Sequence, residues 1–179
     1  MELELKRGGR TARVETLGGE LVSYRDERGL EYIWGGDPAY WPGRNPLLFP
    51  IVGMLKEGKI RFDGREYAME RHGFARRREF TPAARGEDWV RLELRESAET
   101  LALYPYPFRL AVEQRLTDTG FSTAVTVSAL TMGSGLSGIF RYLALVFPQA
   151  VPYMAVFYVT AWWMEEEKKK MTAPAALAL

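Results

Sequence analysis

The feature that most restricts the fold is a series of short strand-like segments, separated by turn residues, that extends to about residue 128. Apolar and charged side chains alternate within residues 89–96 and again within 108–113, which is the two-residue period of half-buried strands. Residues 122–128 are rich in Thr and Val and also indicate a strand. No segment before residue 128 has a convincing helical stripe. Roughly ten short strands at this spacing predict a mainly β sandwich or barrel.

Turn and capping residues add local detail to this prediction. Residues 59–69 are expected to form a hairpin that turns at Asp63-Gly64, a pair favoured where both turn residues need a positive φ. A second hairpin is expected over residues 12–24, with Gly18-Gly19 in its turn. Residues 97–103 could form one or two helical turns, with the serine at the start as N-cap.

Composition excludes several kinds of function. The 24 Lys and Arg balance 23 Asp and Glu, which argues against nucleic acid or an anionic membrane surface as the main partner. The absence of cysteine excludes disulfides, thiolate metal sites and cysteine nucleophiles. The one histidine, His72, cannot build a His-rich metal site. Residues 1–6 have no apolar run typical of a signal peptide, so a cytoplasmic location is expected.

The charged residues are distributed unevenly along the chain. Beyond residue 128 they occur only at Arg141 and in the run 165–170, and residues 142–164 carry no charge. We therefore expect two parts: an N-terminal β-sandwich part over residues 1–128 and an atypical apolar tail over 129–179 in which helix could form.

A set of short motifs occurs in sequence between residues 10 and 128. In chain order they are the segment 17–23, the segment 31–38 followed by Trp41, the run Asn45-Pro46-Leu47-Leu48-Phe49-Pro50-Ile51-Val52-Gly53, the motif His72-Gly73-Phe74-Ala75-Arg76, the segments 99–100 and 104–108, and the turn 116–120. In order and spacing they resemble the N-terminal half of the aldose 1-epimerase superfamily, which includes the galactose mutarotases, and most of all its uncharacterised bacterial branch.

The resemblance implies a fold and a reaction. The fold would be part of a galactose-mutarotase-like β-sandwich, the supersandwich, that binds an aldose in a shallow groove. The reaction would interconvert the α and β anomers. A base removes the proton of the anomeric hydroxyl while an acid protonates the ring oxygen, so that the ring opens and recloses. Because proton transfer is the whole chemistry, no metal or organic cofactor is expected, and the partner would be a small sugar or sugar phosphate.

The resemblance also suggests polar site residues. His72 would hydrogen-bond the sugar near its ring oxygen, although a histidine that satisfies backbone groups at a strand edge is the alternative. Arg76 would meet a phosphate, as would Lys56, although an arginine run such as this one usually faces water. Many relatives place an arginine where this chain has Met54, which cannot donate a hydrogen bond. Either Arg44 or Lys56 replaces it, or substrate binding is weakened.

Aromatic residues near these motifs are candidates for stacking on a sugar face. Trp41 is the preferred one, because it lies between Tyr40 and Pro42 in an expected loop. Phe74 and Tyr40 are further candidates. Trp34 comes after a strand-like alternation and is expected to pack in the core.

The expected function depends on the residues beyond the matching segments. The family's second histidine and its glutamate base would lie after residue 128, where this chain has no histidine and where the glutamates fall in the charge run 165–170. The sequence therefore predicts a truncated epimerase-like protein of reduced activity. The alternatives are a carbohydrate-binding remnant without catalysis, or an inert or membrane-attached fragment.

Three interpretations of the tail remain open. Residues 142–164 are long enough to span a membrane, though Pro148 and Pro152 interrupt them. They could instead form a buried helical hairpin broken at the prolines, or result from an altered reading frame. Because half of a large sandwich would expose strand edges and an apolar face, self-association is also expected.

Overall fold

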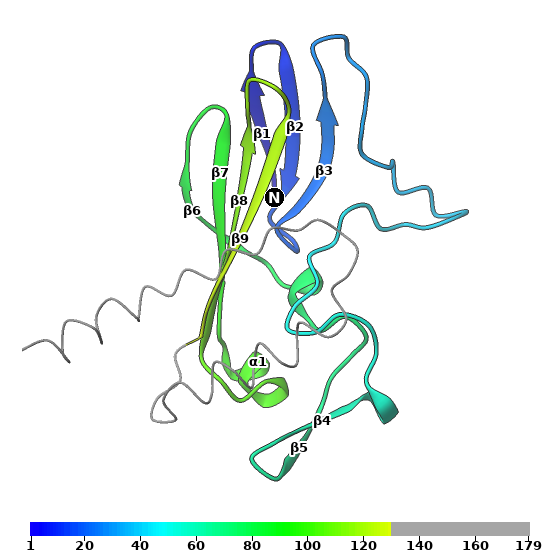
Figure 1. Ribbon diagram of the computed structural model, residues 1–179, viewed down its shortest axis with the longest axis vertical. Coiled ribbons are helices and arrows are strands. Elements are labelled where there is room, and N and C mark those ends of the chain that lie inside the picture. Colours follow the sequence, from blue (N-terminus) through cyan, green and yellow to red (C-terminus); the bar gives the residue numbers. More distant parts are fainter. Residues whose placement is uncertain (130–179) are drawn as a thin grey trace, which may run out of the picture.

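The computed structural model describes residues 1–129, drawn in colour in Figure 1. The three interpretations of residues 142–164 concern residues outside this part and remain hypotheses. Among the described residues, no helix has the length and hydropathy needed to cross a membrane. Nearly all regular structure is β, as the alternating segments predicted.

The first sheet has three antiparallel strands in the order β1 (Glu2–Arg7), β2 (Arg10–Glu15) and β3 (Glu20–Arg25). The pairing of β2 with β3 confirms the predicted hairpin, whose turn contains Gly18 and Gly19, both with positive φ. Strand β1 was not predicted. Its alternation is nevertheless present, because Leu3 and Leu5 are buried while Glu2 and Glu4 are exposed.

The second sheet has four antiparallel strands in the order β6 (Thr81–Arg85), β7 (Trp89–Arg95), β8 (Phe108–Leu116) and β9 (Phe121–Ala129). The last three confirm predicted strands, and β8 and β9 extend further than the sequence patterns indicated. Strand β6 was not predicted, because all five of its residues are exposed and no apolar alternation marks it. Among the described strands it pairs only with β7, and a proline in its second position suits an edge strand.

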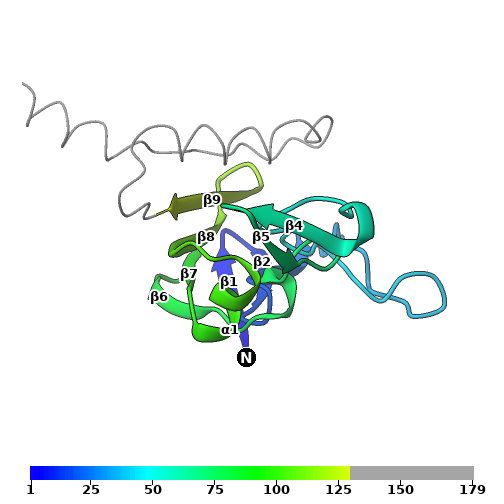
Figure 2. The same cartoon turned by 90° about the horizontal axis from the view of Figure 1, so that it is seen from below.

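A separate hairpin, β4 (Lys59–Phe62) and β5 (Arg65–Ala68), lies beyond the ends of the two larger sheets (Figures 1 and 2). Its turn residues Asp63 and Gly64 have φ values of 47° and 80°. The predicted Asp-Gly turn is therefore confirmed.

Within residues 1–129, helical structure is confined to short segments. Helix α1 (Ala98–Leu103) begins as predicted after Ser97, whose hydroxyl accepts from the backbone N–H of Thr100 while the Thr100 side chain accepts from the N–H of Ser97. Two single 3₁₀ turns, Lys56–Gly58 and Ala75–Arg77, lie in the loops on either side of the β4–β5 hairpin.

The two larger sheets share one core, so the described part is a β-sandwich. Backbone and side-chain hydrogen bonds also join them: Lys6 N–H donates to Glu87 O (2.9 Å), and Gln114 Nε2 donates to Gly19 O (3.2 Å). Thr16 O accepts from Phe80 N–H at 2.8 Å. The core residues from the first sheet are Leu3, Leu5, Ala12, Val14 and Leu21, and those from the second are Val90, Leu92, Leu94, Phe108, Leu110, Val112, Leu116 and Val125.

Candidate functional site

His72 lies in the loop after β5 and contacts a second loop through two hydrogen bonds. Its backbone N–H donates to Gly53 O at 2.7 Å, and Gly53 N–H donates to Nδ1 of the His72 ring at 2.9 Å. The backbone of His72 has a φ of 68°, which residues other than glycine seldom adopt. His72 thus satisfies a backbone group, as the alternative interpretation proposed, but from a loop and through one ring nitrogen only.

The second ring nitrogen of His72, Nε2, has no recorded partner among the described residues. His72 itself is half-buried. The buried side-chain atoms without a partner in this part of the chain belong to Arg76 and Arg109. Burial, together with the positive charges of Arg76 and Arg71, lowers the pKa of His72 below its usual value of 6.5. Both causes favour the uncharged imidazole.

Gly73 lies directly against the backbone of Phe49. A Cβ on this residue would lie 2.1 Å from Phe49 O, and the backbone φ is 69°. The same carbonyl accepts from Phe74 N–H (2.9 Å) and Ala75 N–H (3.2 Å). The neighbour that the absent side chain admits is thus the Phe49 carbonyl. The histidine motif is therefore anchored to the loop that carries Gly53.

Arg76 bends back over the His72 loop. Its Nη2 donates to Arg71 O at 3.0 Å, while its Nε is buried without a partner in the described part of the chain. The next two arginines form ion pairs, Arg77 with Glu70 and Arg78 with Glu99. Arg76 and Arg77 thus both contact the histidine loop, and of the three consecutive arginines Arg76 is the one whose charge acts on His72.

The two other basic candidates differ in their surroundings. Arg44 donates from Nε to Gly35 O (3.3 Å) and lies 3.7 Å from Glu15 through Nη1. Lys56 is exposed, at the start of a 3₁₀ turn, and its side chain has no recorded hydrogen bond or ion pair among the described residues. Met54, two residues before Lys56, is 73% exposed. Lys56 is thus the cation with the greater freedom to contact a ligand.

The aromatic candidates divide by exposure. Trp41 is 48% exposed, and its ring lies so near Gly43 that a Cβ there would be 2.6 Å from it. The expectation that Trp34 packs in the core is wrong: it is 44% exposed and donates from Nε1 to Trp41 O at 2.9 Å. Phe74 is buried and packs on Phe49, so it cannot stack on a sugar.

The structure joins some of the predicted site residues and not others. His72 and Arg76 lie together, since Arg71 contributes to both environments. No recorded hydrogen bond or ion pair of the described residues links Trp41 or Arg44 to His72. Gly53 was missed as a site residue, and its place at the end of the Phe-Pro-Ile-Val-Gly run was the only signal for it. No group of three or more His, Asp or Glu in residues 1–129 could hold a metal ion.

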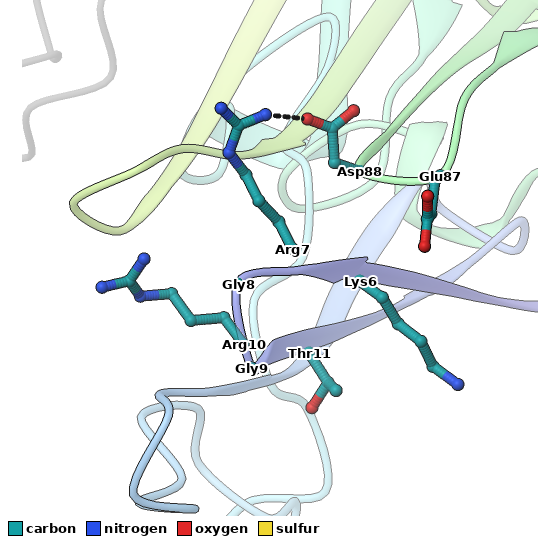
Figure 3. A pocket seen from close by; sticks show the side chains of 8 residues that line it. All are labelled: Lys6, Arg7, Gly8, Gly9, Arg10, Thr11, Glu87 and Asp88. Carbon is teal, nitrogen blue, oxygen red and sulfur yellow. Dashed lines mark hydrogen bonds and ion pairs between the residues drawn. The ribbon is translucent and has the colours of Figure 1, made fainter.

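A depression of about 620 Å³ lies elsewhere, at the β1–β2 turn (Figure 3). Its cations are already paired: Arg7 with Asp88 and Asp118, and Arg10 with Glu27. Charged groups neutralised by neighbours leave little to bind an ion or sugar, so this depression is not a candidate site.

Comparison with known proteins agrees with the motifs. The sequence profile of the aldose 1-epimerase family matches residues 1–135. The plasmid-encoded protein LacX of Lactococcus lactis is 38% identical over 135 residues, which cover 73% of this chain and 45% of LacX. A galactose mutarotase-like protein from Lactobacillus casei is 32% identical with a TM-score of 0.70, over 72% of this chain and 44% of that one.

A galactose mutarotase-related enzyme from Lactobacillus acidophilus is 27% identical with a TM-score of 0.65, over 70% of this chain and 44% of the enzyme. The chain thus spans less than half the length of the curated relatives it matches. The match covers every strand of both sheets and the His72 motif. This chain belongs to the aldose 1-epimerase family.

Proposed function

We propose that this chain binds an aldose, or the phosphate of one, at the surface around His72, and that its chemistry is the interconversion of sugar anomers. The observation that best supports this is the state of His72: Nδ1 of the ring is held by Gly53, and no described residue is recorded in a hydrogen bond to Nε2. A histidine fixed in this way presents a polar atom at a defined place, which is what recognition of a sugar hydroxyl or ring oxygen requires.

Anomer interconversion needs a base as well as an acid. We assign no base within residues 1–129, and the chain spans less than half of its curated relatives. Without general base assistance, turnover would fall by a factor of about 10² to 10⁴. Sugar binding without rapid turnover is therefore the second candidate function, and it too would depend on His72.

Four further residues would complete the proposed site. Arg76 would offer the hydrogens of Nη1 to a phosphate, since Nη2 donates to Arg71 O and Nε is buried. Lys56 would reach the same anion from the neighbouring loop. Trp41 would stack on the sugar through the face of its ring turned away from Gly43. Arg44 would contribute least, because Glu15 and Gly35 already engage it.

Polarimetry of freshly dissolved α-glucose and α-galactose tests catalysis, and tryptophan fluorescence tests binding. Acceleration over buffer that His72→Ala abolishes would support anomer interconversion. A sugar-dependent change in fluorescence without acceleration, also lost in His72→Ala, would support binding alone. If neither signal responds to glucose, galactose or their 6-phosphates, the proposed function is wrong.

A further inference from the structure

The contact between His72 and Gly53 determines the hydrogen positions of the ring. A neutral imidazole carries one hydrogen, on either Nδ1 or Nε2. Nδ1 accepts the N–H of Gly53 at 2.9 Å and therefore cannot carry it. The second hydrogen bond, from His72 N–H to Gly53 O at 2.7 Å, holds the two loops in the register that keeps this contact.

We propose that the backbone N–H of Gly53 is the positioning group that fixes His72 as the Nε2–H tautomer, so that the site presents a neutral N–H donor and selects a ligand oxygen with a free lone pair. The ring oxygen or a hydroxyl oxygen of an aldose meets this requirement. The identification of the ligand rests on the proposed function, whereas the tautomer does not.

This assignment determines what His72 does in the reaction. Nε2 already carries a hydrogen and the lone pair of Nδ1 is engaged by Gly53, so the ring has no free site at which to accept a proton. Full donation from Nε2 would leave an imidazolate, which is much too basic to form at neutral pH. His72 therefore polarises the sugar oxygen through a hydrogen bond and keeps its own proton, as a neutral imidazole can.

The surroundings of the ring favour the same state. Burial and the positive charges of Arg76 and Arg71 lower the pKa of His72. These two arginines are the charged groups that act on it, and both disfavour an imidazolium. A doubly protonated ring would also turn an N–H of its own toward the N–H of Gly53, and the hydrogen bond at Nδ1 would be lost.

NMR of the full chain labelled with ¹⁵N-histidine tests the tautomer directly, because His72 is the only histidine and gives one ring signal pair. We expect Nδ1 to show the shift of an unprotonated nitrogen and Nε2 that of a protonated one from pH 7.5 to 9. The same sample in urea, where the ring is free, should show averaged tautomers and an ordinary pKa. A protonated Nδ1, or averaging in the folded chain, would overturn the proposal.

Two variants separate the roles of the ring nitrogens. His72→Asn places an amide oxygen near the position of Nδ1 and tolerates a positive φ, so it keeps the acceptor for Gly53 but removes the distal donor. His72→Gln keeps a donor near the position of Nε2. Because it loses one neutral hydrogen bond to the ligand, His72→Asn should weaken the fluorescence response to sugar about 3- to 10-fold. Its urea midpoint should stay near that of the parent. His72→Gln should weaken it less, and the reverse order would contradict the donor role.

The two proposals fail in different ways. If Nε2 carries the hydrogen but neither its NMR signal nor the tryptophan fluorescence changes when sugar is added, the proposed function is wrong and the positioning role of Gly53 stands. If sugar binds but Nδ1 is protonated, the positioning role is wrong and the proposed function stands.

Discussion

The contact between Gly73 and Phe49 O makes a sharp prediction about stability. In Gly73→Ala, the new Cβ would lie 2.1 Å from the carbonyl oxygen and 2.4 Å from the carbonyl carbon of Phe49. Neither atom can move freely, because that carbonyl also accepts from Phe74 and Ala75. The substitution must therefore displace backbone as well as strain its own residue.

Two costs add up in this variant. An alanine held at a φ of 69° costs about 1–2 kcal/mol relative to an allowed conformation. Forcing a methyl group into an occupied space costs about 1–3 kcal/mol more. We expect Gly73→Ala to lower the free energy of unfolding by about 2–5 kcal/mol, which at a urea m-value of about 1–3 kcal/mol/M moves the midpoint by at least about 0.7 M.

Gly64→Ala is the matched control, because Gly64 also has a positive φ, of 80°, but a Cβ there would meet no atom within 4 Å. Urea unfolding monitored by tryptophan fluorescence should show only the conformational cost of about 1–2 kcal/mol for this variant. The difference between the two variants isolates the clash with Phe49. Equal costs would refute the argument that the histidine loop is anchored by this contact.

Three further predictions concern other parts of the sandwich. Ser97→Ala removes the N-cap of α1 and should cost about 1 kcal/mol in urea unfolding. Phe108→Ala, deep in the aromatic core, should cost about 3–5 kcal/mol, whereas Tyr40→Ala at an 82% exposed position should cost under about 0.5 kcal/mol. Burial alone would raise the pKa of Asp26, but hydrogen bonds from Leu30, Arg28 and Tyr32 outweigh it and lower the pKa to about 2. Since its ordinary value is 3.8, the stabilisation is complete above about pH 4 and is lost as the pH falls toward 2; Asp26→Asn should flatten the thermal stability over that window, and an unchanged profile would contradict this role.

Local signals predicted local structure well. The Asp63-Gly64 turn and the Ser97 cap each depend on residues within a few positions of one another, so the sequence alone specifies them. Strand β6 has no such signal: its residues face solvent and its position is set by pairing with β7. The placement of the two sheets against each other likewise depends on contacts between residues far apart in the chain, such as that of Gln114 with Gly19.

The candidate site could be predicted only in part. The motif around His72 can be found from the order of short segments, but the amide that holds its ring comes from Gly53, nineteen residues earlier in the chain. Composition also cannot say which aromatic faces inward. Phe74 was a candidate for sugar stacking but is buried, and Trp34 was expected in the core but is exposed. Phe74 is buried because the turn after Gly73 directs it against Phe49.

The bonds that join the two sheets constrain how the chain can fold during synthesis. All three strands of the N-terminal sheet have been synthesised once the chain reaches Arg25. The residues that bond to this part of the chain, Phe80, Glu87 and Gln114, are synthesised much later. At a synthesis rate of about 5–20 residues per second, the apolar face of this sheet stays uncovered for several seconds until the strands of the second sheet have been synthesised. A slowly translated stretch between residues 25 and 114 would lengthen that interval, so codon choice there should influence how much of the protein reaches its folded state.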